Sequence, residues 1–129
     1  VIMNTYSVAP VFKYNDEDMI DIISSAVYDI GYWGCIDNTT EDWQRMSASL
    51  PSDHTFEDVI WALLKTGNSL RIEDAENDDE DYNLTLDRLL NGIKLTIEKK
   101  YWNGNMDDID GEVGDIIFQM SLFDDIVFG

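Results

Sequence analysis

Residues 70–84 read L-R-I-E-D-A-E-N-D-D-E-D-Y-N-L, and this stretch predicts a hairpin. Its centre, Glu73–Asp81, holds seven carboxylates in nine residues. Apolar and polar residues alternate on either side of the acidic run, which is typical of strands. We therefore predict that Leu70–Asp74 and Tyr82–Leu84 pair as two strands and that the acidic run forms the loop between them.

Five helices are predicted around this hairpin, each from apolar residues at helical spacing behind a residue that can cap the first turn. In the third helix Asp58 follows the cap Thr55 by three residues, which is the spacing of a capping box. In chain order the helices are Asp16–Ile30 after Asn15, Glu41–Ala48 after Thr40, Phe56–Lys65 after Thr55, a helix after Thr85 that runs through Ile97, and a last helix that opens in the acidic segment Asp107–Glu112 and runs through Leu122.

Three further segments are predicted as strands. Val1–Lys13 contains Pro10, which favours an edge strand, Tyr32–Ile36 is short and aromatic, and the tail Asp124–Gly129 is expected to return as a strand. Helices separated by short strands and one hairpin indicate an α+β fold, with a small antiparallel sheet packed with about four to five helices. At 129 residues the chain is expected to form a single domain, residues 1–129.

The charge of the chain is its most extreme property. Eight Lys and Arg residues stand against 27 Asp and Glu residues, which gives a net charge of −19 and an isoelectric point near 4.1. Such a field repels nucleic acid and anionic membranes and speeds the encounter with basic protein surfaces. Solubility is the simpler role of so much acid, and the composition alone leaves both roles open.

Few side chains are available for catalysis or metal binding. His54 and Cys35 are the only residues of their types, and His54 is expected to be exposed in a loop. The chain has no glycine-rich phosphate-binding motif and no nucleophile elbow. Asp108–Gly111 resembles part of an EF-hand, but that register would put Met106 and Ile117 at ligand positions. We therefore expect no enzyme, no cofactor and no metal.

The sequence also bears on location. A single cysteine cannot form an intrachain disulfide, so nothing favours secretion. The chain shows neither the pattern of a signal peptide nor an apolar window long enough to span a membrane. The expected location is the cytoplasm.

Two of the four Trp residues lie in informative surroundings. Trp61 lies among apolar residues of a predicted helix and is expected in the core. Trp102 follows two lysines and a tyrosine at a helix end, where core packing and contact with a partner are both open.

Acid is concentrated in three segments, Asp16–Asp21, Glu73–Asp81 and Asp107–Asp115. Carboxylates at i and i+4 of a helix lie about 5–6 Å apart and duplex DNA carries about one charge per 1.7 Å of axis, so rows of carboxylates can imitate a phosphate strand. A nuclease channel rich in Lys and Arg would attract such rows, and salt would weaken the attraction. The residues predicted to bind a partner are Glu73, Asp74, Glu76, Asp78, Asp79, Glu80, Asp81, Asp107, Asp108, Asp110, Glu112 and Asp115.

Three segments carry a resemblance, and they are Ala26–Trp33, Tyr82–Leu95 and Gly111–Gly129. Together they resemble a family of small, mostly uncharacterised proteins carried by phages and prophages of Gram-positive and gut bacteria. The middle segment, Y-N-L-T-L-D-R-L-L-N-G-I-K-L, is the most specific part. The chain departs from the family in the length and acidity of Glu73–Asp81 and at Tyr28-Asp29, where small or Gly-containing sequence is usual. The resemblance brings no catalytic residues with it.

A small acidic phage protein without enzymatic motifs is similar in kind to the inhibitors that phages use against host nucleases, including anti-CRISPR and anti-restriction proteins. The first hypothesis is such an inhibitor, which binds the basic nucleic-acid site of a nuclease and contacts neither nucleic acid nor membrane. The alternative is a phage accessory or structural protein that forms a homo-oligomer, such as a homodimer. A third hypothesis, binding of a nucleotide messenger, needs a pocket near Arg71, Arg88 or Lys94.

Overall fold

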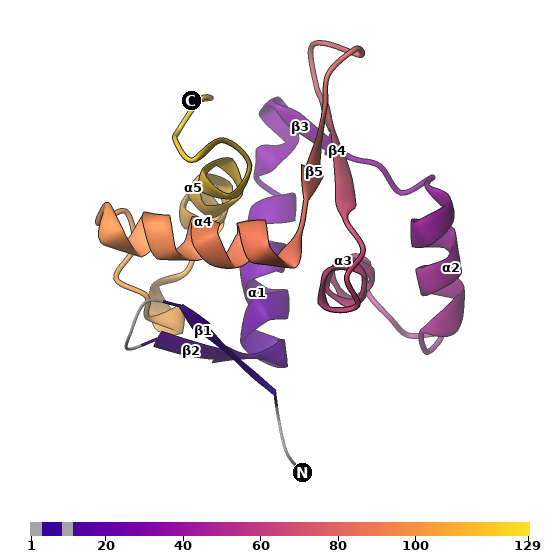
Figure 1. The fold of residues 1–129 in the computed structure, drawn as a ribbon, viewed down its shortest axis with the longest axis horizontal. Helices are drawn as coiled ribbons and strands as arrows, with labels where there is room; N and C mark the ends of the chain where they lie inside the picture. The colour runs from indigo at the N-terminus through magenta and orange to yellow at the C-terminus, as the bar shows by residue number, and fades with distance from the viewer. Residues whose placement is uncertain (1–3, 9–11) are drawn as a thin grey trace.

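The computed structural model describes residues 4–8 and 12–129, and within them the chain folds into five α-helices and two small antiparallel sheets. Figure 1 shows the β1–β2 hairpin at the bottom of the molecule and the three-stranded sheet at the top. The predicted α+β class is therefore confirmed. The elements are β1 Thr5–Val8, β2 Phe12–Asn15, α1 Asp16–Val27, the 3-10 turn η1 Ile30–Tyr32, β3 Gly34–Ile36, α2 Glu41–Ser49, α3 Phe56–Lys65, β4 Leu70–Asp74, β5 Asp81–Leu84, α4 Leu86–Glu98, the 3-10 turn η2 Met106–Asp108 and α5 Gly111–Phe123.

The predicted hairpin is present as β4 and β5. Leu70 pairs with Leu84 and Ile72 with Tyr82, and β3 adds to the other edge of β4 through Ile36. Alternate residues of a strand point to opposite faces, and Leu70, Ile72 and Leu84 are buried while the acids project from the rest of the hairpin. The alternation of apolar residues therefore sets the register that carries the acidic loop.

Side-chain caps begin the helices where the sequence predicts them. Asn15 with Asp18, and Thr55 with Asp58, form complete capping boxes in which each side chain accepts from the backbone of the other residue. At the other end α1 stops at Val27, before the predicted Ile30. The N–H of Asp29 donates to the carbonyl of Ala26, three residues back, and this tightening leads into η1.

Two strand predictions at the N-terminal half are wrong in detail. The segment predicted as one strand, Val1–Lys13, contains β1 and the start of β2, which pair as Tyr6 with Tyr14 and Val8 with Phe12. Pro10 and the first three residues lie outside the described residues. The second predicted strand is shortened to β3, because Tyr32 belongs to η1.

The C-terminal tail is also not a strand among the described residues. The side chain of Gln119 takes the place of a neighbouring strand, since its Oε1 accepts from the N–H groups of Val127 and Phe128 at 2.8 and 2.7 Å. The ring of Phe128 stacks on Trp33 with ring centroids 5.1 Å apart. The tail is therefore held by side chains and does not form a sheet ladder.

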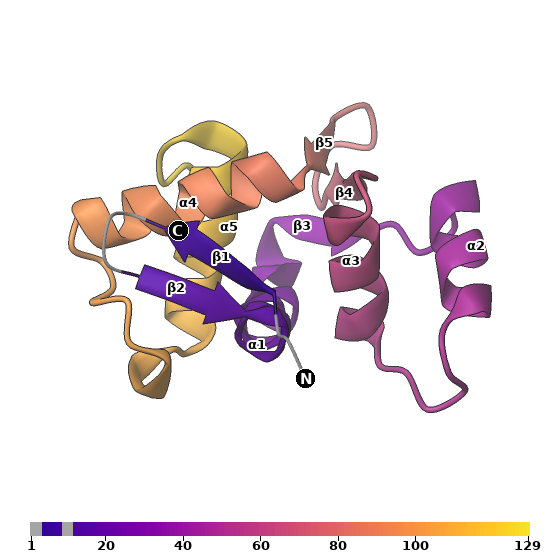
Figure 2. The same cartoon turned by 60° about the horizontal axis from the view of Figure 1, so that its bottom comes forward.

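Helix α5 joins the two halves of the core, because it packs against both α1 and α4 (Figure 2). It begins at Gly111, within the predicted opening segment Asp107–Glu112, because Asp110 is its cap and Met106–Asp108 forms η2. Close approach of α4 and α5 depends on Gly92: a Cβ there would lie 1.9 Å from Ser121 Oγ and 2.7 Å from the carbonyl oxygen of Ile117. The helix crossing therefore leaves no room for a methyl group at this position.

The substitution Gly92→Ala tests this packing. We expect it to lower the free energy of unfolding by about 1–3 kcal/mol, because overpacking of the crossing outweighs the better helix propensity of alanine. The matched control is Gly31→Ala, where a Cβ meets no heavy atom within 4 Å and where we expect a change within about 0.5 kcal/mol. Urea unfolding measures both, and equal stabilities of the two variants would contradict the close crossing.

Candidate functional site

The three acidic segments do not share one face. Figures 1 and 2 show the loop of the β4–β5 hairpin at the end of the molecule opposite to η2 and to the start of α1. The other two segments flank β2, since Asn15 caps α1 and the hydroxyl of Tyr14 donates to the carbonyl oxygen of Gly104 at 2.7 Å. The hairpin loop is therefore an acidic surface of its own.

One cation bridges three carboxylates at the base of the hairpin. The guanidinium of Arg71 donates to Asp37 and to Asp81, each at 2.6 Å, and also to Glu73. These bonds, led by the one to Asp81, raise the pKa of Arg71 above its ordinary value. The hydroxyl and N–H of Thr39, and then Arg71, lower the pKa of Asp37. Glu73 and Asp81, both predicted partner contacts, are thus already paired within the chain.

Asp74 closes the loop of the hairpin. Its Oδ1 accepts from the N–H groups of Glu76 and Asn77 at 2.9 and 3.1 Å, and its Oδ2 accepts from the hydroxyl of Tyr82 at 2.8 Å. The N–H of Glu76 and then the hydroxyl of Tyr82 lower the pKa of this carboxyl. The adjacent Ala75 N–H donates to the carbonyl of Trp33 at 2.8 Å, which anchors the loop to the core.

Four carboxylates remain at the end of the hairpin, and we call them the tip carboxylates. All four are exposed, and none of them takes part in an ion pair among the described residues. Asn77 orders the backbone between them, accepting from the N–H of Asp79 through its side chain and from the N–H of Glu80 through its carbonyl. The tip carboxylates are Glu76, Asp78, Asp79 and Glu80.

The second predicted contact segment divides into exposed and buried acids. Asp107, Asp108, Asp110 and Glu112 are exposed. Asp110 uses one oxygen to cap α5, and Asp108 accepts from the side-chain amide of Asn103 at 2.6 Å. These four stay candidates for a partner contact, and the two in η2, Asp107 and Asp108, lie at the end of the molecule opposite to the hairpin loop.

Asp115 is buried, and its prediction as an exposed partner contact is wrong. Its side chain accepts from Trp33 Nε1 at 2.7 Å, from the Tyr32 hydroxyl at 2.5 Å and from Gln119 Nε2 at 3.0 Å. A buried carboxylate needs donors, and these three replace water. Asp115 was grouped with the neighbouring acids of Asp107–Asp115 because the local sequence does not show that α5 turns this residue toward Trp33.

His54 also departs from its predicted exposure. The ring is half-buried, with Nε2 3.0 Å from Ser47 Oγ and Nδ1 2.7 Å from the carbonyl oxygen of Pro51. The helices α2 and α3 pack against each other and bring the two side chains together across the turn that Pro51 begins. A serine and a histidine seven residues apart around a proline turn are the only sequence signal for this pair.

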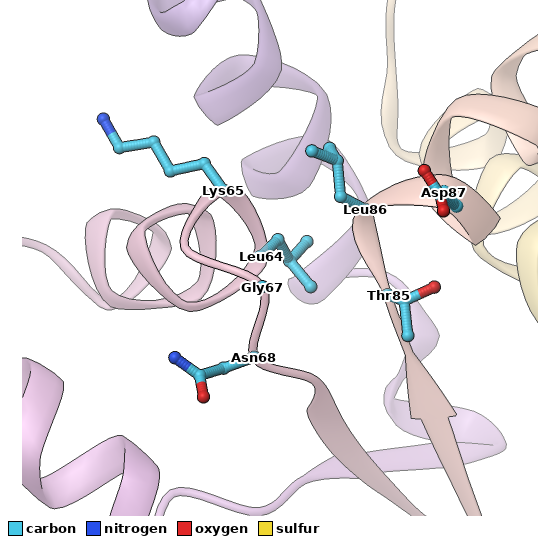
Figure 3. Close-up of a pocket in the computed structure, with 7 residues that line it drawn as sticks. All are labelled: Leu64, Lys65, Gly67, Asn68, Thr85, Leu86 and Asp87. Atoms are coloured by element: carbon cyan, nitrogen blue, oxygen red, sulfur yellow. The ribbon is translucent and has the colours of Figure 1, made fainter.

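A cavity of about 390 Å³ lies between the end of α3 and the start of α4 (Figure 3). Lys65 and Asp87 point to opposite sides of it, so they form no pair. The cations that a nucleotide pocket would need are engaged elsewhere: Arg71 with three carboxylates, Arg88 with the carbonyl of Asn83, and Lys94 with Glu98. No described contact therefore favours the nucleotide hypothesis.

Comparison of the chain with protein families, with curated proteins and with solved structures finds no match.

In residues 4–8 and 12–129, no group of three or more His, Cys, Asp or Glu side chains could hold a metal ion. None of the helices in the same residues is long and apolar enough to cross a bilayer. All four Trp side chains are buried, which decides the position of Trp102 in favour of the core.

The substitution Arg71→Ala tests the network at the base of the hairpin. We expect it to lower the free energy of unfolding by more than the loss of an ordinary surface ion pair does, since three carboxylates would lose their shared cation. Arg45→Ala removes an exposed ion pair to Asp42 and should cost less than about 0.5 kcal/mol. Urea unfolding at low salt measures both losses, and equal losses would show that the network adds nothing to an ordinary surface pair.

Alkaline pH tests the contact between Tyr32 and Asp115. Loss of hydration, followed by the hydrogen bond to Asp115, raises the pKa of Tyr32 from 10.0 to about 12. A raised pKa in the folded state stabilises the protein below pH 10, and this stabilisation is lost as the pH rises through 12. We therefore expect the free energy of unfolding to fall less steeply between pH 10 and pH 12 in Tyr32→Phe than in the unchanged protein. Parallel slopes in urea unfolding would contradict this contact.

Proposed function

We propose that this protein is a phage-encoded inhibitor that binds the basic nucleic-acid site of a host defence nuclease in the bacterial cytoplasm. The tip carboxylates would occupy the positions of DNA phosphates in that site. One observation carries the proposal: the tip carboxylates are exposed and form no ion pair with any described residue, on a hairpin whose other acids are bound within the chain. The nuclease class is that of restriction or CRISPR enzymes.

Electrostatics supports a basic protein partner. The net charge of −19 repels phosphates, whereas it attracts a channel lined by Lys and Arg and raises the rate of encounter. Consecutive Cα atoms lie about 3.8 Å apart, and the charges of one DNA strand follow at about 3.4 Å along the axis. The adjacent acids Asp78, Asp79 and Glu80 therefore carry one charge per residue, a charge per length of chain of the same order as that of one DNA strand.

The order of the loop favours a binding role for the tip carboxylates over a general role of acidic residues in solubility. A flexible acidic loop would lose conformational entropy when it binds, and this loss weakens affinity. Here Asp74 holds the loop backbone and Arg71 joins the two strands below it. Solubility alone needs charge but no such ordering, so the internal bonds favour a contact surface.

Neutralisation of the tip tests the proposal. The variant Glu76→Gln, Asp78→Asn, Asp79→Asn, Glu80→Gln should raise the concentration needed for half-inhibition about tenfold or more, because phosphate-like contacts are lost. The matched control changes the charge equally at the other end with four exposed acids of η2 and the start of α1: Glu17→Gln, Asp21→Asn, Asp107→Asn, Asp108→Asn. We expect less than about a threefold effect there, since η2 and the start of α1 lie at the end of the molecule opposite to the hairpin loop.

The measurement is cleavage of duplex DNA by a panel of purified restriction and RNA-guided nucleases at two salt concentrations. Inhibition should weaken at the higher concentration. Equal loss in both variants would show that net charge and not the tip governs inhibition, and a larger loss in the control would move the contact to η2 and the start of α1. Absence of inhibition across the panel, together with a dimer by light scattering, would replace the proposal with the homo-oligomeric alternative.

A further inference from the structure

Ser47 and His54 have the geometry of a nucleophile and its base. Ser47 Oγ lies 3.0 Å from His54 Nε2, within the range of a working pair. The carbonyl oxygen of Pro51, 2.7 Å from Nδ1, can only accept a hydrogen bond, so Nδ1 of the neutral ring carries the proton. Nε2 then presents a lone pair, and the hydroxyl of Ser47 donates to it.

The chain holds the imidazole in this orientation. Helix α2 ends in the extended residue Leu50, as expected before a proline. The carbonyl of Pro51 then accepts from both the backbone N–H of His54, at 3.0 Å, and from its ring. Thr55 follows at once as the cap of α3. The base is therefore oriented by a third group, as in hydrolases with a Ser-His pair.

Three other helical serines in the described residues behave differently. Ser25, Ser49 and Ser121 each donate to a backbone carbonyl three or four residues earlier, which is the usual bond of a serine within a helix. Ser47 instead donates to a base. Its position in the last turn of α2, facing the 50–55 connection, accounts for the difference.

A cavity of about 220 Å³ opens beside the pair. Trp43 and Phe56, with ring centroids 4.8 Å apart, and Val59 give it an apolar wall. Phe56 is also the first residue of α3, and the first N–H groups of a helix have no acceptor within the helix. The cavity thus offers an apolar surface for a short acyl chain beside Ser47 and His54.

We propose that Ser47 is a catalytic nucleophile that hydrolyses small esters with an uncharged acyl group, with His54 as its general base. Ser47 Oγ bonds to the ester carbonyl carbon while its proton passes to His54 Nε2. The bond to the leaving alcohol then breaks, and the alcohol takes that proton. Water attacks the acylated Ser47 with His54 again as base, which releases the carboxylic acid and restores the serine. This activity is independent of the tip carboxylates.

Two probes test the proposal on the intact chain: hydrolysis of p-nitrophenyl butyrate, and labelling by a fluorophosphonate followed by peptide mapping. We expect the label on Ser47 and hydrolysis above the buffer rate. Ser47→Ala and His54→Gln should each lower the enzymatic rate about 100-fold, and Ser47→Ala should abolish the label. The control is Ser49→Ala, two residues along the chain, because the Ser49 hydroxyl donates to the carbonyl oxygen of Met46. This variant should change neither readout.

Thermal unfolding followed by circular dichroism shows whether each variant is folded. The unchanged protein decides the matter even if a variant fails to fold. Absence of label on Ser47, or hydrolysis no faster than that of Ser47→Ala, would overturn the proposal. Labelling confined to other residues would also overturn it.

Discussion

The acidic β4–β5 hairpin depends on the ion pairs that the guanidinium of Arg71 makes with three carboxylates. It bonds to Asp81 in β5, to Glu73 in its own strand and to Asp37 just after β3. Three carboxylates that close together would repel one another in a chain of net charge −19. A single delocalised cation with several donors satisfies all three, which a lysine could not do with the same planar geometry. The three-stranded sheet can therefore form beneath an acidic loop.

This arrangement divides one acidic run into two kinds of residue. Glu73 and Asp81 at the base of the hairpin form ion pairs with Arg71, and Asp74 accepts hydrogen bonds from the loop and from Tyr82. These bonds order the loop. The tip carboxylates gain position from that order but are not neutralised by it. Charge that is held in place and left unpaired is suited to recognition of a basic surface. The same number of acids in a disordered loop would be suited mainly to solubility.

The two proposed sites arise from different parts of the fold. The tip belongs to the β4–β5 hairpin, whereas Ser47 and His54 belong to the turn between α2 and α3. One site is a convex, charged surface, and the other is a small cavity with an apolar wall. Neither depends on a contact with the other, so each can be altered without disturbing its counterpart.

Local interactions made much of this structure predictable from the sequence, and long-range packing decided the rest. Caps such as Thr55 and the alternation in residues 70–84 act over three or four residues, so the helix starts and the hairpin were predicted correctly. Asp115 was placed in the wrong environment because its donor Trp33 lies 82 residues away. The bond from His54 to Ser47 also requires the packed pair α2 and α3. The sequence determined where along the chain the acids, most helices and the hairpin lie, because these depend on local interactions. The tertiary structure determined which carboxylates are buried or paired, because their partners are distant in sequence.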